Sequence, residues 1–108
     1  MTDTEAPFAC NVNGFSPGER EEHRGLASRL ADAVVATSEL ADGYAFTLDI
    51  SRFSLIDLVT WTALERRCCP FFDIGFEWQR NGGPLMLRLK GRDGVKEFIR
   101  AEFPRNFR

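Results

Sequence analysis

The segment FDIGFEWQRNGGPLMLRLK, residues 72–90, carries the clearest structural pattern in the chain. Apolar residues recur at every second position on both sides of a central turn signal, at Phe72, Ile74, Phe76 and Trp78 and then at Leu85, Leu87 and Leu89. This two-residue period is typical of strands that bury one face. Asn-Gly-Gly-Pro at 81–84 is a strong turn signal between them. The segment therefore predicts an antiparallel β-hairpin.

One more strand is expected before this hairpin. After the turn at 41–43, apolar residues alternate with smaller or polar ones at Tyr44, Phe46, Leu48 and Ile50. The same two-residue period predicts a half-buried strand here.

Three helices are expected around these strands. The first begins at the capping box of Ser16 and Glu19 and runs to about Thr37. The second is capped by Ser54, covers residues 55–68 and ends before Pro70, because a residue preceding proline avoids helical geometry. The third follows the turn at 91–94 and has Val95, Phe98 and Ile99 on one face.

The expected architecture is an α+β two-layer sandwich in the order α-β-α-β-β-α, with a three-stranded mixed or antiparallel sheet covered by helices. The chain of 108 residues is predicted to form a single domain over 1–108, with an irregular leader at 1–15. Hydrophobic residues make up 44% of it, enough for a core without disulfides.

The composition also indicates which classes of binding partner and which cellular location to expect. The net charge is −2, whereas nucleic-acid binders carry a basic surplus, so no nucleic-acid partner is expected. No apolar run approaches the ~18 residues of a membrane span, and the first residues lack the pattern of a signal peptide. A cytoplasmic protein with reduced thiols is therefore predicted. The sequence leaves the oligomeric state open.

The chemically unusual segment is Glu-Arg-Arg-Cys-Cys-Pro at 65–70. On a helical wheel, Glu65, Cys68 and Cys69 fall on the apolar side of the second helix, with Cys68 and Cys69 three and four residues after Glu65. A carboxylate on a buried face is costly unless it is paired or protonated. We expect Glu65 to be satisfied by a metal ion, by free backbone N–H groups or by an arginine such as Arg29 or Arg88.

The cysteines indicate a thiol site. Metal coordination deprotonates thiols, and a third sulfur could come from Cys10 in the leader. The candidate metal ligands are thus Cys10, Glu65, Cys68 and Cys69, for a soft or borderline ion of the zinc, mercury or arsenic class. Two sulfurs that share a metal should lie within about 4 Å of each other. His23, the single histidine, is expected to be a partly exposed helix residue, and no catalytic residue is assigned.

The segment from Glu65 to Phe72, with its E-x-x-C-C-P-F motif, resembles the hallmark of a family of small, mostly uncharacterised bacterial proteins. The resemblance extends to Cys10, to Gly-Tyr-Ala-Phe at 43–46 and to the Gly-x-x-Gly-Val-Lys-x-Phe pattern at 91–98. Such proteins occur beside heavy-metal regulators and resistance genes. The resemblance implies soft-metal or metalloid handling by Cys10, Glu65, Cys68 and Cys69.

Three functions are considered. The preferred one is thiolate binding of a soft metal or metalloid ion. The first alternative is a structural or protein-interaction domain with buried inert thiols, in which Ile56, Val59 and Leu64 could pack against a partner. The second is a thiol-disulfide redox enzyme, in which one cysteine attacks and the other resolves. Binding is favoured over enzymatic activity, because no base is evident and neighbouring charges oppose one another at the thiols.

Overall fold

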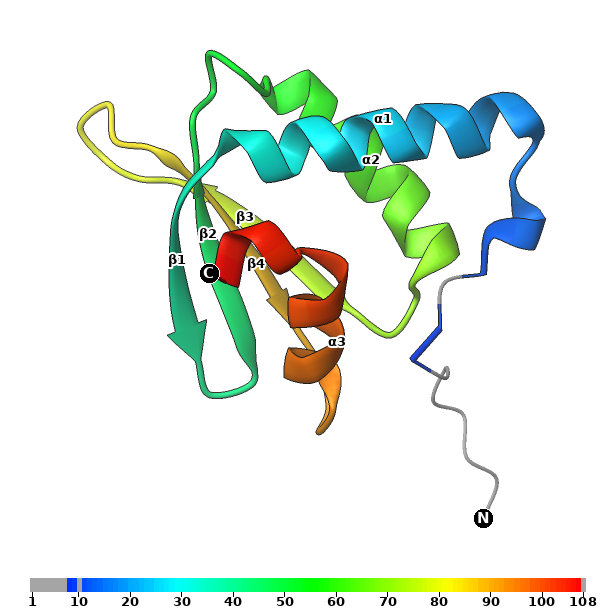
Figure 1. Ribbon diagram of the computed structural model, residues 1–108. Coiled ribbons are helices and arrows are strands. Elements are labelled where there is room, and N and C mark those ends of the chain that lie inside the picture. Colours follow the sequence, from blue (N-terminus) through cyan, green and yellow to red (C-terminus); the bar gives the residue numbers. More distant parts are fainter. Residues whose placement is uncertain (1–7, 10, 108) are drawn as a thin grey trace.

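The computed structural model describes residues 8–9 and 11–107 (Figure 1). It confirms the α+β class. The elements, in order, are the 3₁₀ turn η1 (Val12–Gly14), α1 (Pro17–Ala33), β1 (Val34–Leu40), β2 (Gly43–Leu48), α2 (Leu55–Cys68), β3 (Asp73–Trp78), β4 (Leu85–Lys90), α3 (Val95–Glu102) and the 3₁₀ turn η2 (Pro104–Phe107). None of the helices in the described ranges is long and apolar enough to cross a membrane.

The four strands form one antiparallel sheet in the order β1-β2-β4-β3. The predicted hairpin is confirmed as β3 and β4, with Phe76 opposite Leu87. The strand β2 pairs with β4 and not with β3, so β2 and β3 run parallel with β4 between them. The helix α2 therefore connects two parallel strands and leaves a gap that β4 later fills.

The predicted three-stranded sheet was wrong by one strand. The first helix ends at Ala33 and not near Thr37, and the next seven residues form β1. Its Val34, Val35 and Thr37 are β-branched, which favours strands over helices. The turn at 41–42 then closes a hairpin with β2. Ile50, expected in the strand, lies beyond the end of β2 and is exposed.

One face of the sheet holds the core. The alternation predicted for β4 is confirmed, whereas β2 is buried more fully than expected, because Ala45 is buried too. The residues of the two strands that belong to the core cluster are Tyr44, Phe46, Leu48, Leu85, Leu87 and Leu89. The C-terminal segment of α3 and η2 lies against this sheet, and α1 and α2 pack against each other across its end (Figure 1). The edge strand β3 is less covered, and Phe76 and Trp78 stay exposed.

The helices α1 and α2 are joined by a reciprocal clamp at their N-termini. Each helix begins with phenylalanine, a serine cap and a capping-box acid, which are Phe15, Ser16 and Glu19 in α1 and Phe53, Ser54 and Asp57 in α2. Arg67 of α2 binds Glu19 and lies over the Phe15 ring. Arg29 of α1 binds Asp57 and lies over the Phe53 ring. This clamp fixes the antiparallel register of the two helices.

Candidate metal centre

The buried Glu65 is satisfied by a histidine of the neighbouring helix. Its Oε1 lies 2.7 Å from His23 Nε2, and the two side chains are only 7% and 15% exposed. The expectation that Glu65 turns inward is therefore confirmed. Between the outer ion pairs Glu19–Arg67 and Arg29–Asp57, the pair His23–Glu65 forms the buried middle contact of α1 with α2.

The arginines suggested as partners of Glu65 have other roles. Arg29 binds Asp57, and Arg88 donates to Glu77 on the neighbouring strand β3. The residue that the sequence reasoning missed is His23, which was expected to be a partly exposed helix residue. The spacing of His23 along the helix could have indicated its inward position. It lies three residues before Leu26 and seven before Leu30, both buried, and hence on the inward stripe of α1.

The thiols are buried at the end of α2. Cys68 is 0% and Cys69 is 1% exposed. Their Sγ atoms lie 3.5 Å apart, which is too far for a disulfide but within the distance at which two sulfurs can share an ion. The backbone N–H of Cys69 donates to the Glu65 carbonyl and closes the last helical turn.

Three potential ligand atoms converge here. Nε2 of His23, a carboxylate oxygen of Glu65 and Sγ of Cys68 all lie within 4.8 Å of one another. Within residues 8–9 and 11–107 this is the one group of at least three such side chains, and Cys69 is not a member of it. The two predicted ligands Glu65 and Cys68 thus meet each other and the unpredicted His23.

Cys10 lies outside the described residues, although the chain on either side of it is placed. Asn11 donates its backbone N–H to the Cys68 carbonyl at 2.8 Å. Phe8 packs edge-on against Phe71, with ring centroids 5.1 Å apart, and the Arg92 guanidinium lies over the Phe8 ring, 4.1 Å from its centroid. The described leader residues Phe8 and Asn11 therefore lie beside the end of α2.

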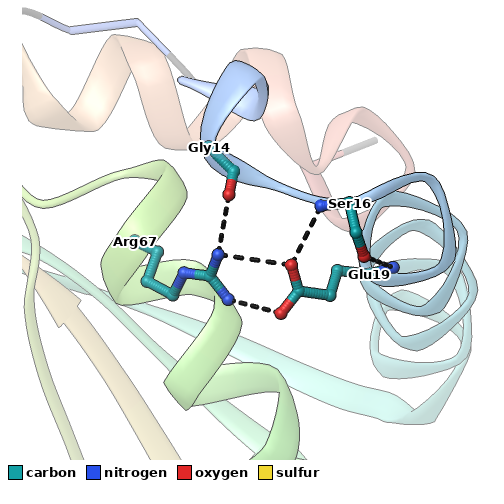
Figure 2. Close-up of polar contacts among 4 residues, drawn as sticks. All are labelled: Gly14, Ser16, Glu19 and Arg67. Carbon is teal, nitrogen blue, oxygen red and sulfur yellow. Dashed lines mark hydrogen bonds and ion pairs between the residues drawn. The ribbon is translucent and has the colours of Figure 1, made fainter.

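A polar bracket beside the thiols fixes the start of α1 to the end of α2 (Figure 2). Arg67 donates to both carboxylate oxygens of Glu19 and to the Gly14 carbonyl, while the Glu19 carboxylate also accepts the Ser16 backbone N–H. The hydrogen bond from Arg67, followed by that from Ser16, lowers the pKa of Glu19 to about 2. Phe15, which lies under Arg67, has its ring 5.4 Å from the His23 ring. The bracket thereby positions His23 opposite Glu65.

A cavity of about 270 Å³ borders the buried pair. Its walls come from α1, α2 and the C-terminal segment, and they include His23, Ala27, Trp61, Glu65 and Glu102–Arg105. Arg105 holds the C-terminal wall to α1, because it donates to Asp32 and to the Ser28 carbonyl. Trp61 is fully buried, yet its Nε1 has no hydrogen-bond partner in the part of the chain that is described.

The donor set fits a borderline ion. Imidazole nitrogen, carboxylate oxygen and thiolate sulfur are the three ligand types that proteins present to zinc. An ion here would be held between His23 and Glu65 and would compensate the buried carboxylate.

Comparison of the chain with protein-family models, with curated proteins and with solved structures gave no match. The resemblance carried by the E-x-x-C-C-P-F motif therefore stays a prediction.

Proposed function

We propose that the protein binds a borderline or soft metal ion through the thiolate of Cys68. The observation that carries this proposal is the convergence of three donor atoms, from His23, Glu65 and Cys68, within 4.8 Å in the interior. Burying an ionisable side chain lowers the stability of the folded protein unless the group is compensated. A cation bound by all three side chains would compensate them together and accounts for their meeting in one place.

Two donor sets meet at Cys68, and each suits a different ion. The nitrogen, oxygen and sulfur set of His23, Glu65 and Cys68 suits a borderline ion such as zinc. The sulfur set of Cys68 and Cys69 suits a more thiophilic ion of the mercury or arsenic class, with Cys10 as a third sulfur. Cys10 is retained in this set because its described neighbours, Phe8 and Asn11, contact Phe71 and Cys68.

Cobalt(II) titration of the reduced, metal-free protein tests the first donor set, because cobalt replaces zinc and its thiolate complexes absorb light. We expect a thiolate-to-cobalt charge-transfer band that C68A abolishes. Replacement of His23 by glutamine should weaken cobalt binding by at least about tenfold, the loss seen even for groups that only support metal ligands. The exposed neighbour Glu21 gives a matched control, since E21Q should leave the titration unchanged.

The same variants separate the two donor sets. Binding of trivalent arsenic or mercury, followed by calorimetry, should depend on Cys68 and Cys69 and should tolerate H23Q. If the wild-type protein gives no charge-transfer band and no heat with either class of ion, or if C68A binds as the wild type does, the proposed function is wrong.

The second candidate is a protein-interaction domain whose thiols are structural. It draws on the outward side of α2, where Ile56 is 78% and Val59 50% exposed; Leu64, which was expected beside them, is buried. A partner covering this surface would bury apolar area. Loss of a complex on I56K and V59K substitution, with no ion bound by the wild type, would favour this candidate.

A further inference from the structure

The sheet has two edge strands, and within the described residues only β1 carries features that oppose pairing with another chain. A bulge interrupts its register between Val34 and Ala36. The turn η2 lies beside it, and the Thr37 hydroxyl donates a hydrogen bond to the Asn106 carbonyl. Bulges and covering segments are means by which natural proteins keep a sheet edge from pairing with a further strand. The β1 edge is therefore poorly suited to extend the sheet.

The other edge strand, β3, has none of these features (Figure 1). It pairs with β4 in an unbroken register from Asp73 to Trp78, and no other described strand lies on its second side. It also contains no proline or lysine, residues that discourage pairing at an edge. The backbone N–H and C=O groups on this side can therefore bind one more strand, which would extend the sheet.

The core face of β3 is apolar but only partly covered. Phe76 lies opposite Leu87 and Trp78 opposite Leu85, and residues directly opposite each other share a face of the sheet. The two leucines are almost completely buried, whereas Phe76 is 39% and Trp78 48% exposed. A strand that pairs with β3 should therefore bring apolar side chains to this face.

The outward face of β3 has a position suited to an acidic residue of the next strand. Arg88 of β4 donates to Glu77 at 2.8 Å, and it lies directly opposite Gly75. A Cβ at Gly75 would meet no atom within 4 Å, so open space separates Arg88 from the free edge. The Cα of an acid placed opposite Gly75 on a further strand would lie about 10 Å from that of Arg88, which two long side chains can bridge.

We propose that the partner strand is β3 of a second copy of this chain, paired antiparallel about a two-fold axis at Phe76. In this register Glu77 of each copy lies opposite Gly75 of the other, where Arg88 can bind it. By symmetry two identical ion pairs form. On the core face the two Phe76 side chains meet each other, and Trp78 of each copy meets Ile74 of the other.

Charge repulsion disfavours the two neighbouring registers. An axis at Gly75 would put Asp73 opposite Glu77 of the other copy, and an axis at position 77 would put the two Glu77 side chains opposite each other. Like charges directly opposite each other destabilise a strand pair. The sequence of β3 therefore favours the register with its axis at Phe76 and pairs the strand with itself in a single way.

Two charge variants, E77R and R88E, test this arrangement. In a dimer of either variant, like charges face each other at two symmetric positions, so each variant alone should dimerise about tenfold more weakly than the wild type. In an equimolar mixture every one of these charges faces its opposite across the interface, so the mixture should regain about tenfold in dimerisation. Sedimentation velocity at several concentrations measures the association. The reduced, metal-free protein serves, since neither residue belongs to the proposed metal centre.

A second pair of variants locates the interface in the sheet. The substitution F76K brings two like charges together at the axis and should abolish the dimer. Its matched control, V35K, changes an exposed residue of the other edge strand and should leave the dimer intact. Circular dichroism checks the fold of each variant. If F76K does not fold, the charge variants at exposed positions decide the question.

Several results would overturn the proposal. One is a wild type that remains monomeric at about 1 mM, where even weak association is visible. Another is a dimer that persists in folded F76K or disappears in V35K. The third is a mixture of E77R and R88E that dimerises no better than either variant alone.

Discussion

The imidazole of His23 meets the carboxylate of Glu65 at 2.7 Å across the interface of α1 and α2, where both side chains are nearly excluded from water. This contact allows both polar side chains to be buried between the helices, because each group compensates the desolvation of the other. It also places a nitrogen and an oxygen within coordinating reach of the Cys68 sulfur.

Removal of the histidine should therefore destabilise the metal-free protein. The substitution H23A leaves a buried carboxylate without its partner, and we expect a loss of about 3 kcal/mol, in line with broken buried pairs. Urea unfolding measures this loss. The double variant with Glu65→Gln should recover part of it, and the control R24A, at an exposed position of α1, should change little. Equal stability of H23A and the wild type would contradict the pairing.

Substitution by alanine should destabilise the protein at one glycine of the sheet and have little effect at another. A Cβ at Gly43 would stand 1.9 Å from the Leu89 carbonyl oxygen, whereas one at Gly75 would meet no atom within 4 Å. Because Leu89 belongs to the central strand, G43A forces backbone of the sheet to move, and we expect a cost of about 3 kcal/mol. The variant G75A should stay within about 0.5 kcal/mol of the wild type. Thermal unfolding distinguishes them, and comparable losses would argue against the register of β2 with β4.

Acid should break the hydrogen-bonded ion pair of Arg67 with Glu19 at the start of α1, because it protonates the Glu19 carboxylate. The folded-state pKa of Glu19 is about 2, below its ordinary value of 4.5, so its contribution to stability is complete above that ordinary value and disappears as the pH falls toward about 2. The wild type should thus be more stable than E19Q near neutral pH, and the difference should shrink through this window. Chemical unfolding at several pH values measures the difference. Three other carboxylates also have a lowered pKa, but they are present in both the wild type and E19Q, so their contributions cancel in the stability difference. They are Glu39, Asp49 and Asp57. A gap that stays constant with pH would exclude the Arg67–Glu19 bond as its cause.

The thiols at the end of α2 should react slowly in the native state. Cys68 and Cys69 are almost wholly inaccessible, so alkylation requires the helix end to open. Mass spectrometry of peptides after timed alkylation should show both residues modified far more slowly than in urea, and cobalt should slow them further. Rapid modification of one of them near neutral pH would instead favour the thiol-disulfide redox enzyme.

The local features of the fold could be predicted because local chemistry determines them. Ser54 and the proline after Cys69 bounded α2 correctly, and the alternation on either side of Asn81 gave the β3–β4 hairpin. The strand β1 could not be separated from α1 by its pattern, because Val34 continues the four-residue spacing of Leu26 and Leu30. Only its pairing with β2 resolves this ambiguity.

The site was predictable in part for a similar reason. The inward direction of Glu65 and Cys68 follows from the apolar face of a single helix. Their meeting with His23 depends on the register of α1 against α2, which the clamp of Arg67 on Glu19 and of Arg29 on Asp57 fixes across long stretches of sequence. Pairings between distant arginines and acids cannot be read from spacing, and Arg29, one of the partners considered for Glu65, binds Asp57 instead.

The position of β4 has a consequence for biosynthesis. This strand occupies the middle of the sheet next to β2, yet it is the last of the four to leave the ribosome. Until it is made, the hairpin of β1 and β2 and the lone strand β3 lack the neighbour that joins them, and their apolar faces await it. The sheet of the nascent chain is therefore completed when β4 inserts between β2 and β3. A pause in translation before Leu85 would leave an aggregation-prone intermediate with unpaired strand edges, of the kind that chaperones bind.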